Sequence, residues 1–322
     1  MIDVPKSPDL EKQIVGLRNS MNFQARKSFI SSASHLYDQL FPKGISSRVQ
    51  KLIIIPDGKL GTIPFEVLIN KKNIPENEDY RQLPYLLRQT QISYHYSGTL
   101  YQQIFQAAPL GGSKSQNIFL CAPVIFPRQN LSALPGTETE VNQIHRLFSE
   151  QDFEAHRYLR HEAGEQVVKS EKLKDYQYIH FATHGLVNEA SPELSRIFLA
   201  PDTLQGEDGS LYVGEIYNLQ LSAALVAVSA CETGLGKLSQ GEGIMGLSRA
   251  LIYAGAENLL VSLWKVSDQS TSQLLVNFYE QTLRQHHSPA YGAALRQAKL
   301  NLLESPQYAQ PYYWAPFILI GR

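Results

Sequence analysis

Two segments of the sequence end in residues that could form a thiol–imidazole pair. One reads Tyr178-Ile-His-Phe-Ala-Thr-His184-Gly185, and the other reads Leu225-Val-Ala-Val-Ser-Ala-Cys231-Glu-Thr-Gly234. Each starts as a short apolar run typical of a buried parallel strand. Ligands bind at the carboxyl ends of such strands, so His184 and Cys231 are expected to face one crevice.

A thiol beside an imidazole is suited to nucleophilic catalysis. His184 can take the proton of the Cys231 thiol, or hold the thiolate as an ion pair, and later protonate a leaving amine. The backbone N–H groups of Gly185 and Cys231 are candidate oxyanion donors, since glycine lets the backbone approach closely. The alternative is that Cys231 is a small buried apolar residue, which is the usual role of a lone cysteine at a strand end.

The elements that must position this pair form an alternating α/β series. Continuous apolar strands separated by helical periodicity indicate a largely parallel sheet covered on both faces. The expected strands are 51–55, 91–97, 117–122, 176–183, 223–229, 258–264 and 316–321, with a hairpin and helical turn over 61–68. The expected helices are two within residues 1–47, one ending near Phe105, and 137–149, 244–253, 271–284 and 291–303. Thr137 and Glu140 are spaced as a capping box.

Three segments are expected in the organisation of the chain. Residues 1–47 form a helical segment that packs on the core through one apolar face. Residues 48–110 and 111–322 follow, and the Gly- and Ser-containing stretch 109–116 is the best linker between them.

Composition excludes several functional classes. The formal net charge is -1, with 18% charged and 43% hydrophobic residues, which excludes global disorder and gives no support for nucleic-acid binding or a polybasic membrane surface. Two cysteines, Cys121 and Cys231, cannot build a disulfide scaffold or a four-thiolate zinc site. No signal peptide or membrane span is recognisable, so a cytoplasmic protein with reduced cysteines is expected, whether complete or a piece of a longer chain.

Other motifs have weaker explanations. His180 and His184 share a strand face and could bind zinc, but metalloprotease spacing requires a helix and a glutamate, so a packed core histidine is favoured for His180. Residues 241–246 match the letters of a dinucleotide fingerprint. They lie about a dozen residues beyond the strand, where Glu242 would repel phosphates.

An ordered set of motifs resembles the CHAT domain, a caspase-like cysteine peptidase family related to separase, gingipain and caspases. The motifs lie at 56–68, 93–97, 134–140, 180–185, 229–234, 241–247, 254–256, 261–268 and 313–317. The resemblance implies a three-layer α/β/α sandwich with a mostly parallel sheet. It has a degenerate N-terminal caspase-like half at 48–110 and an active half at 111–322. It also implies that Cys231 is the nucleophile and His184 the base, with no cofactor.

The resemblance also suggests a specificity residue. Separase has a similar Leu-Trp-x-Val-x-Asp stretch whose aspartate reads the P1 arginine, the residue before the scissile bond. Carried onto Asp268, this implies a preference for P1 Arg or Lys. The alternative is that Asp268 caps a helix beginning near Ser270. Glu232 and Glu242 are further candidate pocket acids, and Trp264 is either a pocket wall or part of the core.

The resulting hypothesis is a cysteine endopeptidase that cleaves proteins, possibly after a basic residue, in a regulated bacterial defence or cell-death system. Two alternatives stay open: a catalytically silent scaffold or interaction module of the same fold, and a cysteine-dependent amidase or acyl transferase. The expected partners are a protein or peptide substrate and a regulatory or sensor protein, such as a tetratricopeptide protein. No nucleic acid, membrane or metal is expected.

Overall fold

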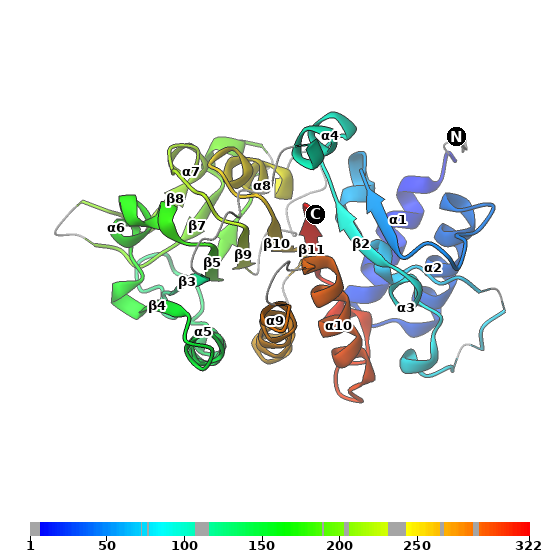
Figure 1. Ribbon diagram of the computed structural model, residues 1–322. Helices are drawn as coiled ribbons and strands as arrows, with labels where there is room; N and C mark the ends of the chain where they lie inside the picture. Colours follow the sequence, from blue (N-terminus) through cyan, green and yellow to red (C-terminus); the bar gives the residue numbers. More distant parts are fainter. Residues whose placement is uncertain are drawn as a thin grey trace.

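A central sheet organises the molecule (Figure 1). The computed structural model describes residues 7–71, 73–75, 77–106, 116–188, 190–202, 206–230, 243–264, 267–285 and 290–322. Within these residues an eight-stranded sheet has the order β1-β2-β11-β10-β9-β5-β3-β4. In that order the strands are Lys51–Ile54, Gln91–Tyr94, Phe317–Ile320, Leu259–Ser262, Leu225–Ala230, Tyr178–Thr183, Asn117–Ala122 and Glu154–Leu159.

The sheet is mostly parallel, as expected. Strands β10, β9, β5, β3 and β4 run in one direction. Strands β1, β2 and β11 are parallel to one another, and the direction reverses where β11 pairs antiparallel with β10. The carboxyl ends of β5, β9 and β10 therefore share one edge of the sheet.

Helices cover both faces of the sheet (Figure 1). Helices α5, α9 and α10 lie along one face, and α7 and α8 lie on the other. The helices are α1 (Leu10–Asn22), α2 (Arg26–Leu40), α3 (Leu86–Gln89), α4 (Gly98–Gln106), α5 (Pro135–Ser149), α6 (Glu165–Val168), α7 (Val213–Ile216), α8 (Gly243–Tyr253), α9 (Asp268–Leu283), α10 (Tyr291–Glu304) and α11 (Pro311–Trp314). None of the helices among the described residues has the length and apolar character needed to cross a membrane.

The burial of a strand decided whether its sequence pattern predicted it. All residues of β3, β5, β10 and β11 are buried, which is why these strands are mostly apolar, with His180 of β5 as a buried polar exception. The helices α1 and α2 bury Ile14 and Leu36 in the same core, as their periodicity predicts. The edge strand β4 was not predicted, because most of its side chains are polar and partly or fully exposed.

Two local expectations were wrong. The segment 61–68 forms no hairpin, because residues Gly58–Thr62 and Phe65–Val67 are short 3-10 helices, although the second of these is the helical turn expected there. The capping box of Thr137 and Glu140 is also absent. Helix α5 begins at Pro135, and the Thr137 hydroxyl donates to the carbonyl of Leu134 at 2.7 Å. The carboxylate of Glu140 is buried against His180 instead.

A second, small sheet was missed. It pairs β6 (Gly185–Leu186), β7 (Arg196–Phe198) and β8 (Ser210–Tyr212) in antiparallel fashion and directly follows His184. Strands of two or three residues are too short to give a periodic signal. The candidate linker at 109–116 lies outside the described residues except for Gln116.

A buried polar cluster joins the first two strands to the C-terminal helices. The ammonium of Lys299, on α10, bonds one carboxylate oxygen of Glu66, and the Tyr94 hydroxyl donates to the other at 2.6 Å. The Phe65 N–H donates to the Tyr94 oxygen at 2.7 Å. Burial lowers the pKa of Lys299, while the neighbouring Glu66 carboxylate raises it. Residues 48–110 are therefore held to the rest of the chain by charge as well as by sheet pairing.

Removing one partner of this cluster should be costly. Lys299→Met leaves the Glu66 carboxylate buried without a counter-charge, which typically costs about 3–5 kcal/mol. We expect a lower urea midpoint for Lys299→Met than for the double variant Lys299→Met/Glu66→Gln, in which no charge is left buried. Equal midpoints for the single and double variants would contradict this electrostatic role.

Candidate functional site

His184 lies where the expected crevice should be. Strands β5 and β9 are parallel neighbours, and their last paired residues are Thr183 and Ala230. His184 directly follows Thr183, and in the sequence Cys231 directly follows Ala230. Cys231 itself lies outside the described residues. The register therefore places His184 and the end of β9 at the same edge of the sheet.

The hydrogen bond of the His184 ring defines its tautomer. Its side chain is buried, with 1% of the residue exposed, and Nε2 lies 2.8 Å from the carbonyl oxygen of Ser132. A carbonyl only accepts hydrogen bonds, so Nε2 carries the hydrogen and donates it. In the neutral ring, Nδ1 then carries a lone pair. This buried Nδ1 has no hydrogen-bond partner among the described residues.

An apolar ring covers one side of this imidazole. The Phe126 ring meets the His184 ring edge-on at a centroid distance of 4.7 Å. Phe126 packs with Leu134 and Phe198 in a small apolar cluster. The Phe198 N–H donates to the His184 carbonyl at 2.9 Å, which fixes the histidine backbone. Apolar packing therefore excludes water from one side of the His184 ring.

Gly185 offers an available backbone donor. It pairs with Ile197 between β6 and β7. The hydrogen bond from the Phe198 N–H to the His184 carbonyl makes the Gly185–Ile197 pair the non-hydrogen-bonded type, in which the N–H points away from the partner strand. The other expected oxyanion donor, the N–H of Cys231, is not among the described residues.

Asp268 is close to the segment that holds His184. It is the first residue of α9, on the chain that leaves the carboxyl end of β10, and it is partly buried. Ser267 occupies the N-cap position, so Asp268 is not the cap. A Cβ built on Gly136 would lie 2.4 Å from the Cβ of Asp268, so the two backbones meet only because residue 136 is glycine.

The remaining candidates have different outcomes. Trp264 is 2% exposed, and its Nε1 donates to the carbonyl of Tyr312 at 3.1 Å, which favours the core over a pocket wall. Glu232 and Glu242 lie outside the described residues. Cys121 is fully buried in β3, and burial raises the pKa of its thiol, as an inert core cysteine requires.

His180 is a packed core histidine, which is the interpretation that the sequence favoured over a zinc ligand. Its Nε2 lies 2.8 Å from Oε1 of the buried Glu140. Among the described residues, the group of side chains close enough to share a metal ion is Glu165, Glu207 and Glu215, and it does not include His180.

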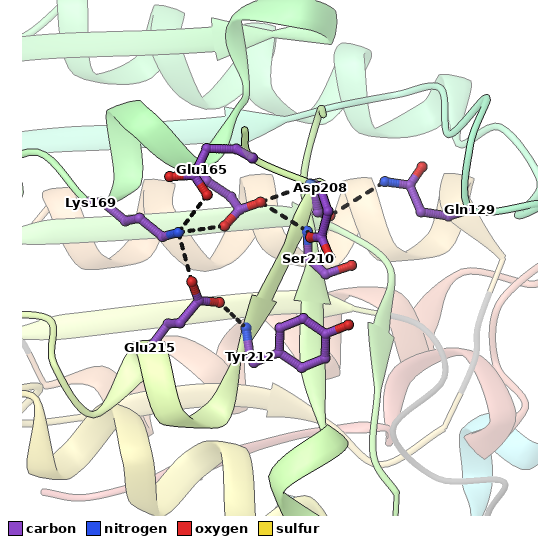
Figure 2. Close-up of polar contacts among 9 residues, drawn as sticks. Gln129, Glu165, Lys169, Asp208, Ser210, Tyr212 and Glu215 are labelled. Carbon is purple, nitrogen blue, oxygen red and sulfur yellow. Dashed lines mark hydrogen bonds and ion pairs between the residues drawn. The ribbon is translucent and has the colours of Figure 1, made fainter. Parts of the chain in front are cut away.

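That glutamate group surrounds a lysine (Figure 2). The Lys169 Nζ lies 2.7 Å from a carboxylate oxygen of each of Glu165, Glu207 and Glu215. The second oxygen of Glu215 accepts from the Tyr212 N–H at 2.9 Å. An ammonium therefore fills the position that a cation would need, and the cluster ties α6 to the small sheet after His184.

Sequence reasoning did not find this cluster. Glu165 lies on α6 and Lys169 directly follows that helix, whereas Glu207 lies in the loop before β8 and Glu215 lies on α7. The i,i+4 spacing of Glu165 and Lys169 is the one local signal within the cluster, and it does not reveal the other two glutamates. Burial raises the pKa of Glu165, although its bond to Lys169 acts in the opposite direction. Its Oε1 also accepts from the Gly209 N–H at 2.7 Å, which explains why a carboxylate is tolerated there.

Curated relatives resemble most of this chain. Tetratricopeptide repeat protein 28 of Mus musculus is 24% identical over 86% of the chain, and the same protein of Homo sapiens matches to the same extent. The chain spans 12% of the length of these relatives.

Solved structures share the fold. The Arg-specific cysteine proteinase gingipain R is 10% identical, with a TM-score of 0.58, over 100% of this chain and 79% of that chain. A complex of the pro- and mature domains of RgpB from Porphyromonas gingivalis gives a TM-score of 0.57 at 11% identity, covering 97% and 75% of the chains. The caspase-like α/β fold expected from the sequence is confirmed.

The family is also shown by a sequence comparison. The model of the CHAT domain matches residues 31–322, which include all eight strands of the described central sheet. The match confirms the resemblance found from the motifs. The chain therefore belongs to the CHAT domain family.

Proposed function

We propose that this chain is a cysteine endopeptidase in which Cys231 is the nucleophile and His184 the general base. The observation that carries the proposal is the buried Nδ1 of His184, which has no hydrogen-bond partner among the described residues and carries the lone pair of the neutral ring when Nε2–H donates to the Ser132 carbonyl. The strand next to β5 leads directly into Cys231. Family membership and the gingipain-like fold support a peptidase.

The proposed reaction follows from these groups. Nδ1 of His184 takes the thiol proton, and the sulfur of Cys231 forms a bond to the peptide carbonyl carbon. The Gly185 and Cys231 N–H groups stabilise the oxyanion. The C–N bond then breaks as the imidazolium returns its proton to the leaving amine. Water, deprotonated by His184, hydrolyses the thioester and restores the thiol.

Two alternatives fit the same fold. The position of His184 at the end of β5, beside the strand that leads into Cys231 in the sequence, favours an enzyme over a scaffold without turnover. An amidase or acyl transferase would use the same pair and differs only in the acyl acceptor. The likeness to tetratricopeptide repeat proteins supports a regulatory protein partner. A bacterial defence or cell-death setting and a cytoplasmic location stay predictions.

Cleavage should depend on the thiol. The purified protein is incubated with a proteome, and new protein N-termini are mapped by mass spectrometry. Wild type should generate N-termini that Cys231→Ala does not. A loss of about 10⁴-fold or more in rate is expected, because removing a nucleophile leaves only binding and oxyanion effects. Cys121→Ala is the matched control. The same termini from Cys231→Ala and wild type would reject the proposal.

We further propose that Asp268 reads a basic P1 side chain. Its support is its position after β10, at the edge of the sheet where His184 lies, and its contact with the segment that begins α5. A carboxylate there would accept charge-assisted hydrogen bonds from Arg or Lys.

This specificity can be tested with a library of peptides that differ at P1. Asp268→Ala should lower kcat/KM for P1 Arg and Lys by about 10- to 100-fold, since a hydrogen bond to a charged group is worth ~1.5–3 kcal/mol. Gly136→Ala should weaken the same preference by displacing Asp268. Glu280→Ala, which removes a partly exposed acid farther along the same helix, serves as the control. An unchanged basic preference in Asp268→Ala would refute this role.

A further inference from the structure

Three polar side chains meet inside the core below the candidate site. The His180 Nε2 lies 2.8 Å from Glu140 Oε1, and the Tyr279 hydroxyl lies 3.3 Å from His180 Nδ1. His180 is 0% exposed, and Glu140 and Tyr279 are equally enclosed. We call these three residues the buried polar network.

The network joins the three elements that carry the site. His180 lies on β5, four residues before His184. Glu140 lies on α5, just after the segment that contains Ser132, Leu134 and Gly136. Tyr279 lies on α9, the helix that begins with Asp268.

Strand β5 and the α5 segment are therefore attached at two points. The first is the contact between His180 and Glu140, and the second is the bond from His184 to the Ser132 carbonyl. Four residues of strand separate the two points by about 13 Å. A shift of α5 along β5 would move the Ser132 carbonyl away from the His184 Nε2.

Each hydrogen bond of the buried polar network has a defined donor and acceptor. Burial raises the pKa of Tyr279 well above its ordinary value, so its hydroxyl keeps its proton. The carboxylate of Glu140 requires a donor in this dry environment, and the His180 Nε2–H supplies it. An apolar core would pack these elements without fixing their relative position along the strand, which is what directional bonds do.

We propose that Glu140, His180 and Tyr279 are positioning residues that set the register between β5, α5 and α9, and thereby hold His184 in its Nε2–H tautomer. Their effect on cleavage rests on the proposed peptidase function. Their effect on the His184 ring does not, because the tautomer exists with or without turnover.

The test uses the full chain with ¹⁵N-labelled histidine and the variants Glu140→Gln and Tyr279→Phe. Each variant retains nearly the same shape and removes a charge or one hydroxyl. Tyr291→Phe is the control, because it removes a buried hydroxyl that bonds Tyr178 near the opposite end of β5. The His184 resonances are assigned with His184→Asn, and thermal unfolding shows that each variant is folded.

Wild type and Tyr291→Phe should show the single Nε2–H tautomer of His184, and Glu140→Gln and Tyr279→Phe should show a mixture of tautomers. Peptide cleavage should fall by about 10-fold in the last two, part of the ~10²–10⁴-fold that a positioned acid–base group contributes. A single wild-type tautomer in both folded network variants would overturn the proposal. If Glu140→Gln does not fold, the tautomer of His184 in Tyr279→Phe alone decides the proposal: a mixture supports it, and a single wild-type tautomer overturns it. If wild type cleaves nothing, the peptidase function fails, whereas the tautomer result still decides the positioning role.

Discussion

The hydrogen bond from His184 Nε2 to the Ser132 carbonyl is the interaction on which the candidate site depends. It decides which nitrogen of the buried ring carries the hydrogen, and it leaves on Nδ1 the lone pair that the proposed base would use. The remaining features hold its two partners in place. The Phe198 N–H fixes the histidine backbone, and the contact between His180 and Glu140 holds β5 against α5.

Ion pairs stabilise the scaffold on either side of this bond. On one side, the Lys169 cluster ties α6 to the small sheet that carries Gly185. On the other, Lys299 and Glu66 join residues near the first strands to helix α10. Both clusters include partners that are far apart in sequence, such as Lys169 with Glu207 and Lys299 with Glu66. For the fully buried pair of Lys299 and Glu66, removing one partner would leave the other charge without compensation, which is strongly destabilising.

The sequence predicted the parts of the fold that depend on burial. Strands β3, β5, β9, β10 and β11 and the long helices follow from apolar runs and periodicity, and His184 follows from the strand end. The polar edge strand β4 and the short strands β6–β8 gave no such signal. Glu140 was interpreted from local spacing as part of a capping box. Its actual partner, His180, lies forty residues away, and tertiary contacts of that range leave no local pattern.

The most direct measurement of a thiol–imidazole pair is the pH dependence of Cys231 alkylation by iodoacetamide, followed by mass spectrometry in wild type and His184→Gln. Burial keeps Cys121 unreactive, so it serves as the internal control. A pair predicts that the alkylation midpoint of wild type lies well below the ordinary thiol pKa of ~8.5, and that His184→Gln moves it toward that value. The same midpoint in both proteins would contradict the pairing of His184 with Cys231.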